Sequence, residues 1–93
     1  MSKQTYNQQF NHFALRQGKN PETAQPLDHI EFIDTLKNYT YYFVPLHNGR
    51  YLCEIYCIEQ QQRIQFDADS ITLIYVELIK RITEMINGTF DFS

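Results

Sequence analysis

The N-terminal segment, residues 3–17, has apolar residues at helical spacing within an otherwise polar stretch rich in glutamine and asparagine. Its apolar positions are Tyr6, Phe10, Phe13 and Ala14. This spacing places them on one narrow stripe of a helix, and Gly18 stands where a helix commonly ends. Few other features favour this helix, so we expect it to be stable only when docked on the rest of the chain.

A second helix is predicted to begin at Asp28, after a loop with two prolines at 19–27. With Asp28 as N-cap, Glu31 stands at the third helical position, the spacing of a capping box. Leu27 and Phe32 then have the spacing of a hydrophobic staple. We expect this helix to end near Asn38 and to bury Ile30, Ile33 and Leu36.

Two β-rich runs follow, joined by Asn48-Gly49. This dipeptide favours a two-residue hairpin turn, because both central residues of a type I′ turn need positive φ. A two-residue loop pairs Val44 with Cys53 and Tyr42 with Ile55. Pro45 cannot donate a backbone hydrogen bond, so the first strand is expected at an edge of the sheet.

A polar turn at 59–62 leads to a third, short strand at 63–66. If Ile64 pairs with Cys57 and Phe66 with Ile55, all four side chains share one face. A slip of one residue would reverse this arrangement.

The final regular segment, residues 71–86, has an apolar stripe at helical spacing. Asp67-Ala-Asp-Ser precedes it as a helix-start cluster, and Asn87-Gly88 follows it as a stop signal. Glu77 and Arg81 have the i,i+4 spacing of a helical ion pair. The β-branched run at its start also fits a strand, but the length and both caps favour a helix.

The predicted fold is therefore a small α+β domain of order α-α-β-β-β-α, with a three-stranded antiparallel sheet packed on helices. We expect one domain over residues 1–93, because this length is typical of a single domain. Within it, residues 1–18 form a loosely docked helix, residues 28–88 the core, and residues 89–93 a tail.

The composition of the chain indicates its cellular location and the kinds of partner that it can bind. The N-terminus has no apolar run typical of a secretion signal, and no stretch reaches membrane-spanning length, so we expect a cytoplasmic protein with reduced Cys53 and Cys57. The net charge is −3. No basic cluster could neutralise several phosphates, which argues against nucleic acid as a partner.

No pattern typical of catalysis or of cofactor binding is present. The three histidines lie in different predicted elements, and none is spaced with another metal ligand. Cys53 and Cys57 lie about 13 Å apart on a strand, which is too far for a disulfide. The three glycines are used in turns and helix ends, which leaves none for a phosphate-binding loop. We expect no catalytic residue, metal, cofactor or small-molecule substrate, and hence no enzyme.

From Asp28 onward, the predicted order α-β-β-β-α resembles that of double-stranded-RNA-binding domains. Those domains place lysines at the start of their last helix to hold phosphates. Here Asp67 and Asp69 stand at that position. The resemblance therefore covers element order alone and implies no RNA binding.

One sheet face remains as a candidate binding surface. In the predicted register this face carries Tyr39, Tyr41, Phe43, Leu52, Glu54, Tyr56, Arg63 and Gln65. Tyrosine and arginine are enriched at binding hot spots, so the predicted partner-binding residues are Tyr39, Tyr41, Phe43, Glu54, Tyr56 and Arg63. The alternative is that a helix or the tail covers this face as a second small core.

These observations favour a non-enzymatic protein-binding module: an inhibitor, immunity, antitoxin or anti-defence factor, or an adaptor. One alternative is a nucleic-acid-associated regulator that uses the basic N-terminal segment, with Lys3, Arg16 and Lys19. Another is a homodimer that buries the aromatic face between two copies. We therefore expect a protein partner or self-association.

Overall fold

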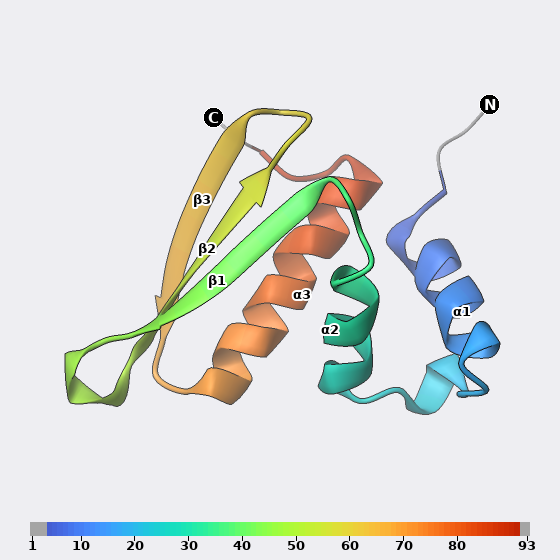
Figure 1. Ribbon diagram of the computed structural model, residues 1–93, viewed down its shortest axis with the longest axis horizontal. Coiled ribbons are helices and arrows are strands. Elements are labelled where there is room, and N and C mark those ends of the chain that lie inside the picture. Colours follow the sequence, from blue (N-terminus) through green and yellow to red (C-terminus); the bar gives the residue numbers. More distant parts are fainter. Residues whose placement is uncertain (1–3, 92–93) are drawn as a thin grey trace.

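A computed structural model describes residues 4–91 and shows helices packed on a three-stranded antiparallel sheet (Figure 1). The predicted order α-α-β-β-β-α is confirmed, as is the α+β class. The regular elements are α1 (Tyr6–Arg16), α2 (Pro26–Ile33), β1 (Tyr39–Pro45), β2 (Tyr51–Cys57), β3 (Gln62–Ala68) and α3 (Ile71–Asn87). Two short 3₁₀ turns, η1 (Pro21–Thr23) and η2 (His47–Gly49), connect them. The strands lie in the order β1-β2-β3, so β2 is central.

The turn between β1 and β2 contains three residues, not the predicted two. Asn48 and Gly49 adopt positive φ angles of 67° and 76° as expected, but His47 also lies in the turn. The backbone N–H of Leu46 donates to the carbonyl of Arg50 at 2.8 Å and closes the loop.

This extra turn residue shifts β1 by one position, so the predicted pairing of Val44 with Cys53 is wrong. Phe43 pairs with Cys53 and Tyr41 with Ile55. A shift of one residue turns every side chain of β1 to the opposite face. The observed register directs Tyr39, Tyr41 and Phe43 toward the helices, which buries more apolar surface than Thr40, Tyr42 and Val44 would.

Strand β3 is longer than predicted and pairs two positions away from the predicted register. Ile64 lies opposite Ile55, and Phe66 lies opposite Cys53. Because the shift is an even number of residues, the predicted face is confirmed. Ile64 and Phe66 share the helix-facing side with Ile55 and Cys53.

Helix α2 begins earlier and ends earlier than predicted. Gln25 is the N-cap, Pro26 is the first helical residue, and Asp28 stands at the third helical position. The Asp28 carboxylate accepts the Gln25 backbone N–H at 2.8 Å. Leu27 is exposed, so the predicted staple is wrong, and the helix ends at Ile33 rather than near Asn38.

Helix α3 follows its predicted pattern, and the alternative of a strand at its start is wrong. The Ser70 hydroxyl caps it by accepting the Leu73 N–H, and Gly88 ends it in a left-handed conformation. The Glu77–Arg81 ion pair forms at 3.1 Å. Ile74, Leu78 and Ile82 are fully buried against β2, β3 and α2, and each contributes roughly 1.5–3 kcal/mol by leaving water.

Helix α1 packs against α2 and α3 at the far side from the sheet (Figure 1). Tyr6 and Phe10 are buried there and stack with His29 of α2. The Tyr6 hydroxyl lies 2.9 Å from His29 Nδ1, and the Tyr6 backbone N–H donates to the Asn87 side chain at 2.8 Å. These contacts join α1 to both other helices.

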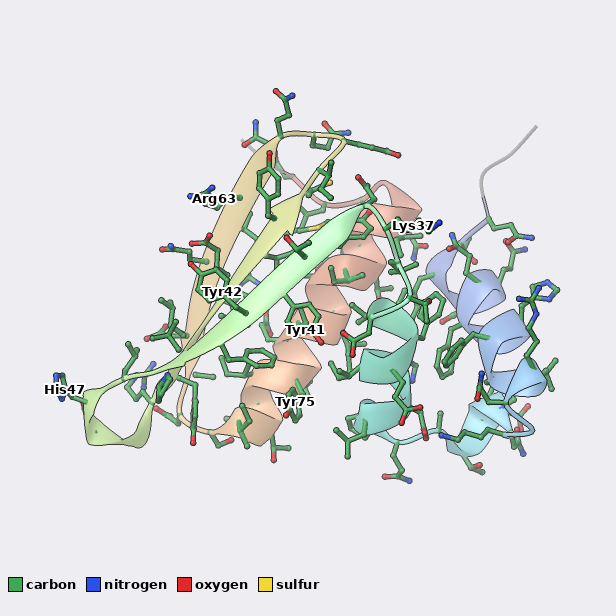
Figure 2. The ribbon with its side chains drawn as sticks, in the orientation of Figure 1. Lys37, Tyr41, Tyr42, His47, Arg63 and Tyr75 are labelled. Atoms are coloured by element: carbon green, nitrogen blue, oxygen red, sulfur yellow. The ribbon has the colours of Figure 1, made fainter. Side chains whose placement is uncertain are left out.

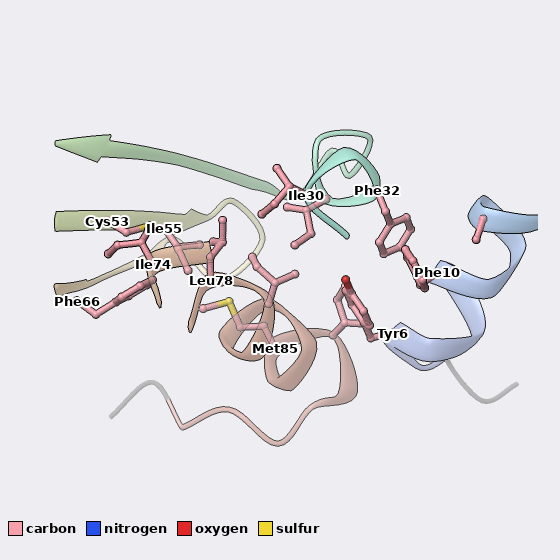
Figure 3. Packing of buried hydrophobic residues seen from close by; sticks show 14 residues of the cluster. Tyr6, Phe10, Ile30, Phe32, Cys53, Ile55, Phe66, Ile74, Leu78 and Met85 are labelled. Carbon is pink, nitrogen blue, oxygen red and sulfur yellow. The ribbon is translucent and has the colours of Figure 1, made fainter. Parts of the chain in front are cut away.

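The buried side chains form one cluster that runs from the sheet through α3 and α2 to α1 (Figure 3). Cys53 lies at its sheet end, and Cys53 and Cys57 are both buried free thiols. Burial raises the pKa of Cys53 to about 12, so this thiol is neutral at ordinary pH.

Replacing Gly49 with Val should lower the free energy of unfolding by about 1 kcal/mol or more, because a β-branched residue is strained at positive φ. A Cβ at this position would meet no atom within 4 Å, so the loss would be conformational and not steric. Urea unfolding measures the difference. Gly49→Asn is the matched control, since asparagine tolerates this conformation. Equal stabilities for the valine and asparagine variants would contradict this explanation.

Cys53 and Cys57 should react with a thiol reagent only as fast as the native protein opens, because both thiols are buried out of reach of the reagent. A Leu15→Cys variant gives the control, since Leu15 is exposed and its replacement should be labelled at once. Mass spectrometry over time follows all three positions. Immediate labelling of the native thiols would show that the sheet end of the core is open.

Candidate protein-binding surface

The six residues predicted to form one binding surface lie on both sides of the sheet. Glu54, Tyr56 and Arg63 lie on the side away from the helices, as predicted for β2 and β3. The placement of Tyr39, Tyr41 and Phe43 beside them is wrong, because the shifted register of β1 turns these residues toward the helices.

Three of the four aromatic residues of β1 have structural contacts on the helix side. The Tyr41 hydroxyl donates to the Asp34 carboxylate, and burial raises the Tyr41 pKa above its usual value. The Phe43 ring centroid lies 5.5 Å from that of Tyr75 on α3. Tyr39 is also packed against the core cluster.

The side of the sheet away from the helices is called here the open face. It is formed by Thr40, Tyr42 and Val44 of β1, Leu52, Glu54 and Tyr56 of β2, and Arg63, Gln65 and Asp67 of β3. Tyr42 and Arg63 project from this face (Figure 2). Both side chains are largely exposed, at 51% and 65%.

Glu54 lies at the centre of the open face and is only 7% exposed. Its carboxylate accepts a 2.6 Å hydrogen bond from Gln65 Nε2 and lies 3.4 Å from Arg63 Nε. The Tyr42 hydroxyl also interacts with this carboxylate, and the two groups shift each other's pKa. Partners from both neighbouring strands therefore compensate the cost of removing this carboxylate from water.

Arg63 has a second contact within this network. Its guanidinium carbon lies 5.7 Å from the ring centroid of Tyr56, within the range of a cation–π interaction. Arg63 is thereby oriented between a carboxylate and an aromatic ring. The network thus holds two aromatic residues, an amide and an arginine in defined positions on an exposed sheet.

The hydrogen bonds of this network also determine its charge state. The bond from Gln65 lowers the Glu54 pKa, opposed by burial and assisted by Tyr42 and the positive charge of Arg63. The interaction with Glu54 raises the pKa of Tyr42, because ionisation of the phenol would place two negative charges together. At neutral pH the site therefore holds a carboxylate, a phenol and a guanidinium.

The basic N-terminal residues of the alternative hypothesis that the structure describes do not belong to the open face. Of the basic N-terminal residues, Lys3 lies outside the described residues and Arg16 is exposed. Lys19 pairs with Asp28 at 2.6 Å and with Glu31 at 3.5 Å. Residues 4–91 contain no group of three or more potential metal ligands, and no helix within them is long and apolar enough to cross a membrane.

Comparison with known proteins yields no match: no family model matches the chain, and no curated protein or solved structure is significantly similar to it. The arrangement of side chains is therefore the basis for functional inference.

Sequence reasoning missed Tyr42, the β1 member of the network. A usable signal was present on β2, because a central glutamate between Cys53 and Ile55 marks the face that needs polar neighbours. Of the two possible registers, only the one that places Tyr42 opposite Glu54 gives the carboxylate a hydroxyl group as its neighbour, because Phe43 has none.

Replacing Glu54 with Gln should reduce the loss of stability that the protein suffers in acid. The Glu54 pKa is lowered from 4.5 in the folded state. The ionised Glu54 side chain therefore contributes its full stabilisation above pH 4.5, and this stabilisation is lost as the pH falls through the folded-state pKa. Urea unfolding at a series of pH values compares the two proteins. Parallel stability curves between neutral and acidic pH would show that the Glu54 contacts do not contribute to folding.

Proposed function

We propose that this chain is a non-enzymatic protein-binding module that uses the open face of its sheet. The observation that supports this proposal is the network around Glu54, which orients Tyr42, Tyr56 and Arg63 on a surface that no helix of residues 4–91 covers. Tyrosine and arginine supply much of the binding energy in protein interfaces. Side chains that are already ordered also lose less entropy when a partner binds.

The composition of the open face favours a protein over other partners. Val44 and Leu52 pair beside the network and add aliphatic area to a mainly polar surface. Arg63 is committed to Glu54, so the face offers no free cluster of positive charge for phosphates. A mixed surface of aromatic, aliphatic and paired charged groups is typical of protein interfaces.

The class of protein follows from size and charge. A small domain with net charge −3 fits a partner with a basic contact surface, because complementary charge accelerates encounter. We infer an inhibitor, an immunity, antitoxin or anti-defence factor, or an adaptor, that acts by covering part of that partner.

This proposal is tested with the double variant Tyr56→Ala, Arg63→Ala, which alters the open face and leaves β1 unchanged. The immobilised chain should retain one protein from lysate of its native cell in near-equimolar amount, and the double variant should lose it. Titration with that purified partner should then show at least about thirtyfold weaker binding, since one hot-spot residue contributes about 2 kcal/mol.

Leu15→Ser is the matched control, because Leu15 is exposed on α1, and this variant should bind like the wild type. Circular dichroism and unfolding curves establish that all variants are folded. A partner that binds the folded double variant with unchanged affinity would exclude the open face as its site.

A further inference from the structure

The hydrogen bonds at both ends of β1 identify which backbone groups face outward. The Ile58 N–H donates to the Asn38 carbonyl, and the Leu46 N–H donates to the Arg50 carbonyl, both at 2.8 Å. Bonded positions alternate along an antiparallel pair, so the even-numbered residues of β1 bond to β2. The N–H and C=O groups of Tyr39, Tyr41 and Phe43 therefore point away from the sheet.

Pro45 also occupies an outward position in this alternation. Its missing N–H consequently removes no bond between β1 and β2, which explains how a proline fits in this strand. Within residues 4–91, β1 forms one edge of the sheet and no further strand pairs with it. An open depression of about 340 Å³, lined by Ile33, Asp34, Tyr39, Thr40 and Tyr41, lies along its first half.

The two edges of the sheet differ in the feature that discourages edge pairing. Strand β3 carries Arg63 and Asp67, and Asp67 also pairs with Arg50 at 2.9 Å. Charged side chains on an edge strand oppose pairing with another chain. Strand β1 has no charged residue from Tyr39 to Pro45, so the outward N–H and C=O groups of Tyr39, Tyr41 and Phe43 are available to a further strand. Pro45, at the end of the strand, offers only its C=O there, because proline has no N–H.

The order of residues in β1 is self-complementary about Tyr42. When the strand is laid antiparallel on itself with Tyr42 at the centre, Tyr41 lies opposite Phe43 and Thr40 lies opposite Val44. Aromatic pairs and β-branched pairs are the cross-strand combinations that stabilise antiparallel sheets. The outward residues Tyr41 and Phe43 then fall in the hydrogen-bonded positions that this alignment requires.

We propose that β1 pairs with β1 of a second copy of this chain about a two-fold axis at Tyr42. The product is a symmetric dimer with one continuous six-stranded antiparallel sheet. The axis is perpendicular to the sheet, so both open faces lie on the same side and meet at the two Tyr42 side chains. This inference rests on the edge of β1 and does not depend on the proposed function.

Cysteine cross-linking tests the register of this dimer. The two copies of residue 42 occupy a non-hydrogen-bonded pair with Cα atoms about 4.5 Å apart, within the roughly 4.4–6.8 Å range of disulfides. Tyr42→Cys should therefore form a disulfide dimer under mild oxidation. Thr40→Cys mixed with Val44→Cys should form the mixed disulfide, whereas each alone should not, because its two copies lie about 13 Å apart.

Tyr56→Cys on central strand β2 is the matched control and should form no disulfide-linked dimer under the same oxidation. The native Cys53 and Cys57 are buried on the opposite face, so they do not compete. Cross-linking of Tyr42→Cys no faster than of Tyr56→Cys, or absence of the mixed 40–44 disulfide, would overturn the proposed pairing.

Light scattering tests the association without cross-links. The wild type should show twice the 11.2 kDa chain mass. Tyr42→Lys should be monomeric because two ammonium groups would meet at the axis, and Tyr42→Phe should remain dimeric. A wild-type mass of one chain at concentrations up to about 1 mM, where even weak association is measurable, would refute the dimer. A Tyr42→Lys protein that is still dimeric would refute this interface.

Discussion

The number of residues in the turn between β1 and β2 controls the layout of the whole sheet. With His47 inside the turn, Tyr41 and Phe43 face the helices and Tyr42 faces outward. Phe43 then meets Tyr75 of α3, and the aromatic area of β1 becomes part of the core. Because side chains alternate strictly along a strand, no local adjustment could exchange these roles once the turn has formed.

Glu54 and this register support each other. A carboxylate on a central strand needs polar partners on both neighbouring strands to offset its removal from water. The observed alignment places Tyr42 opposite Glu54 on one side and Gln65 opposite it on the other. The alternative alignment would place Phe43 there, with no group that could bond to the carboxylate. The open face is thus a consequence of the pairing that fills the core.

The sequence predicted the elements well because periodicity and caps are local signals. The stripe and both caps of α3 are visible in the residues themselves, and the alternation in β2 separates Cys53 and Ile55 from Glu54. Strand β1 carries aromatic residues on both sides, so its pattern does not identify a buried face. Which face of β1 is buried depends on the presence of His47 in the turn and on the packing of Phe43 against Tyr75. For α2, Pro26 was the available signal for the start of the helix, because proline is favoured at the first helical position. Asp28 did not decide between the two possible starts, because aspartate fits both the N-cap and the third helical position of a capping box. The side of the sheet on which the residues lie was therefore predicted correctly for β2 and β3 and wrongly for β1.

The bond from the Tyr6 backbone to the Asn87 side chain joins positions 81 residues apart in the chain. On the ribosome, α1 is synthesised before α2, the sheet and α3, whereas Asn87 becomes available only after nearly all of α3 has emerged. Helix α1 therefore obtains its contacts with α3 only after the elements between them have been synthesised. The docking of α1 is in this way coupled to the completion of the last turn of α3.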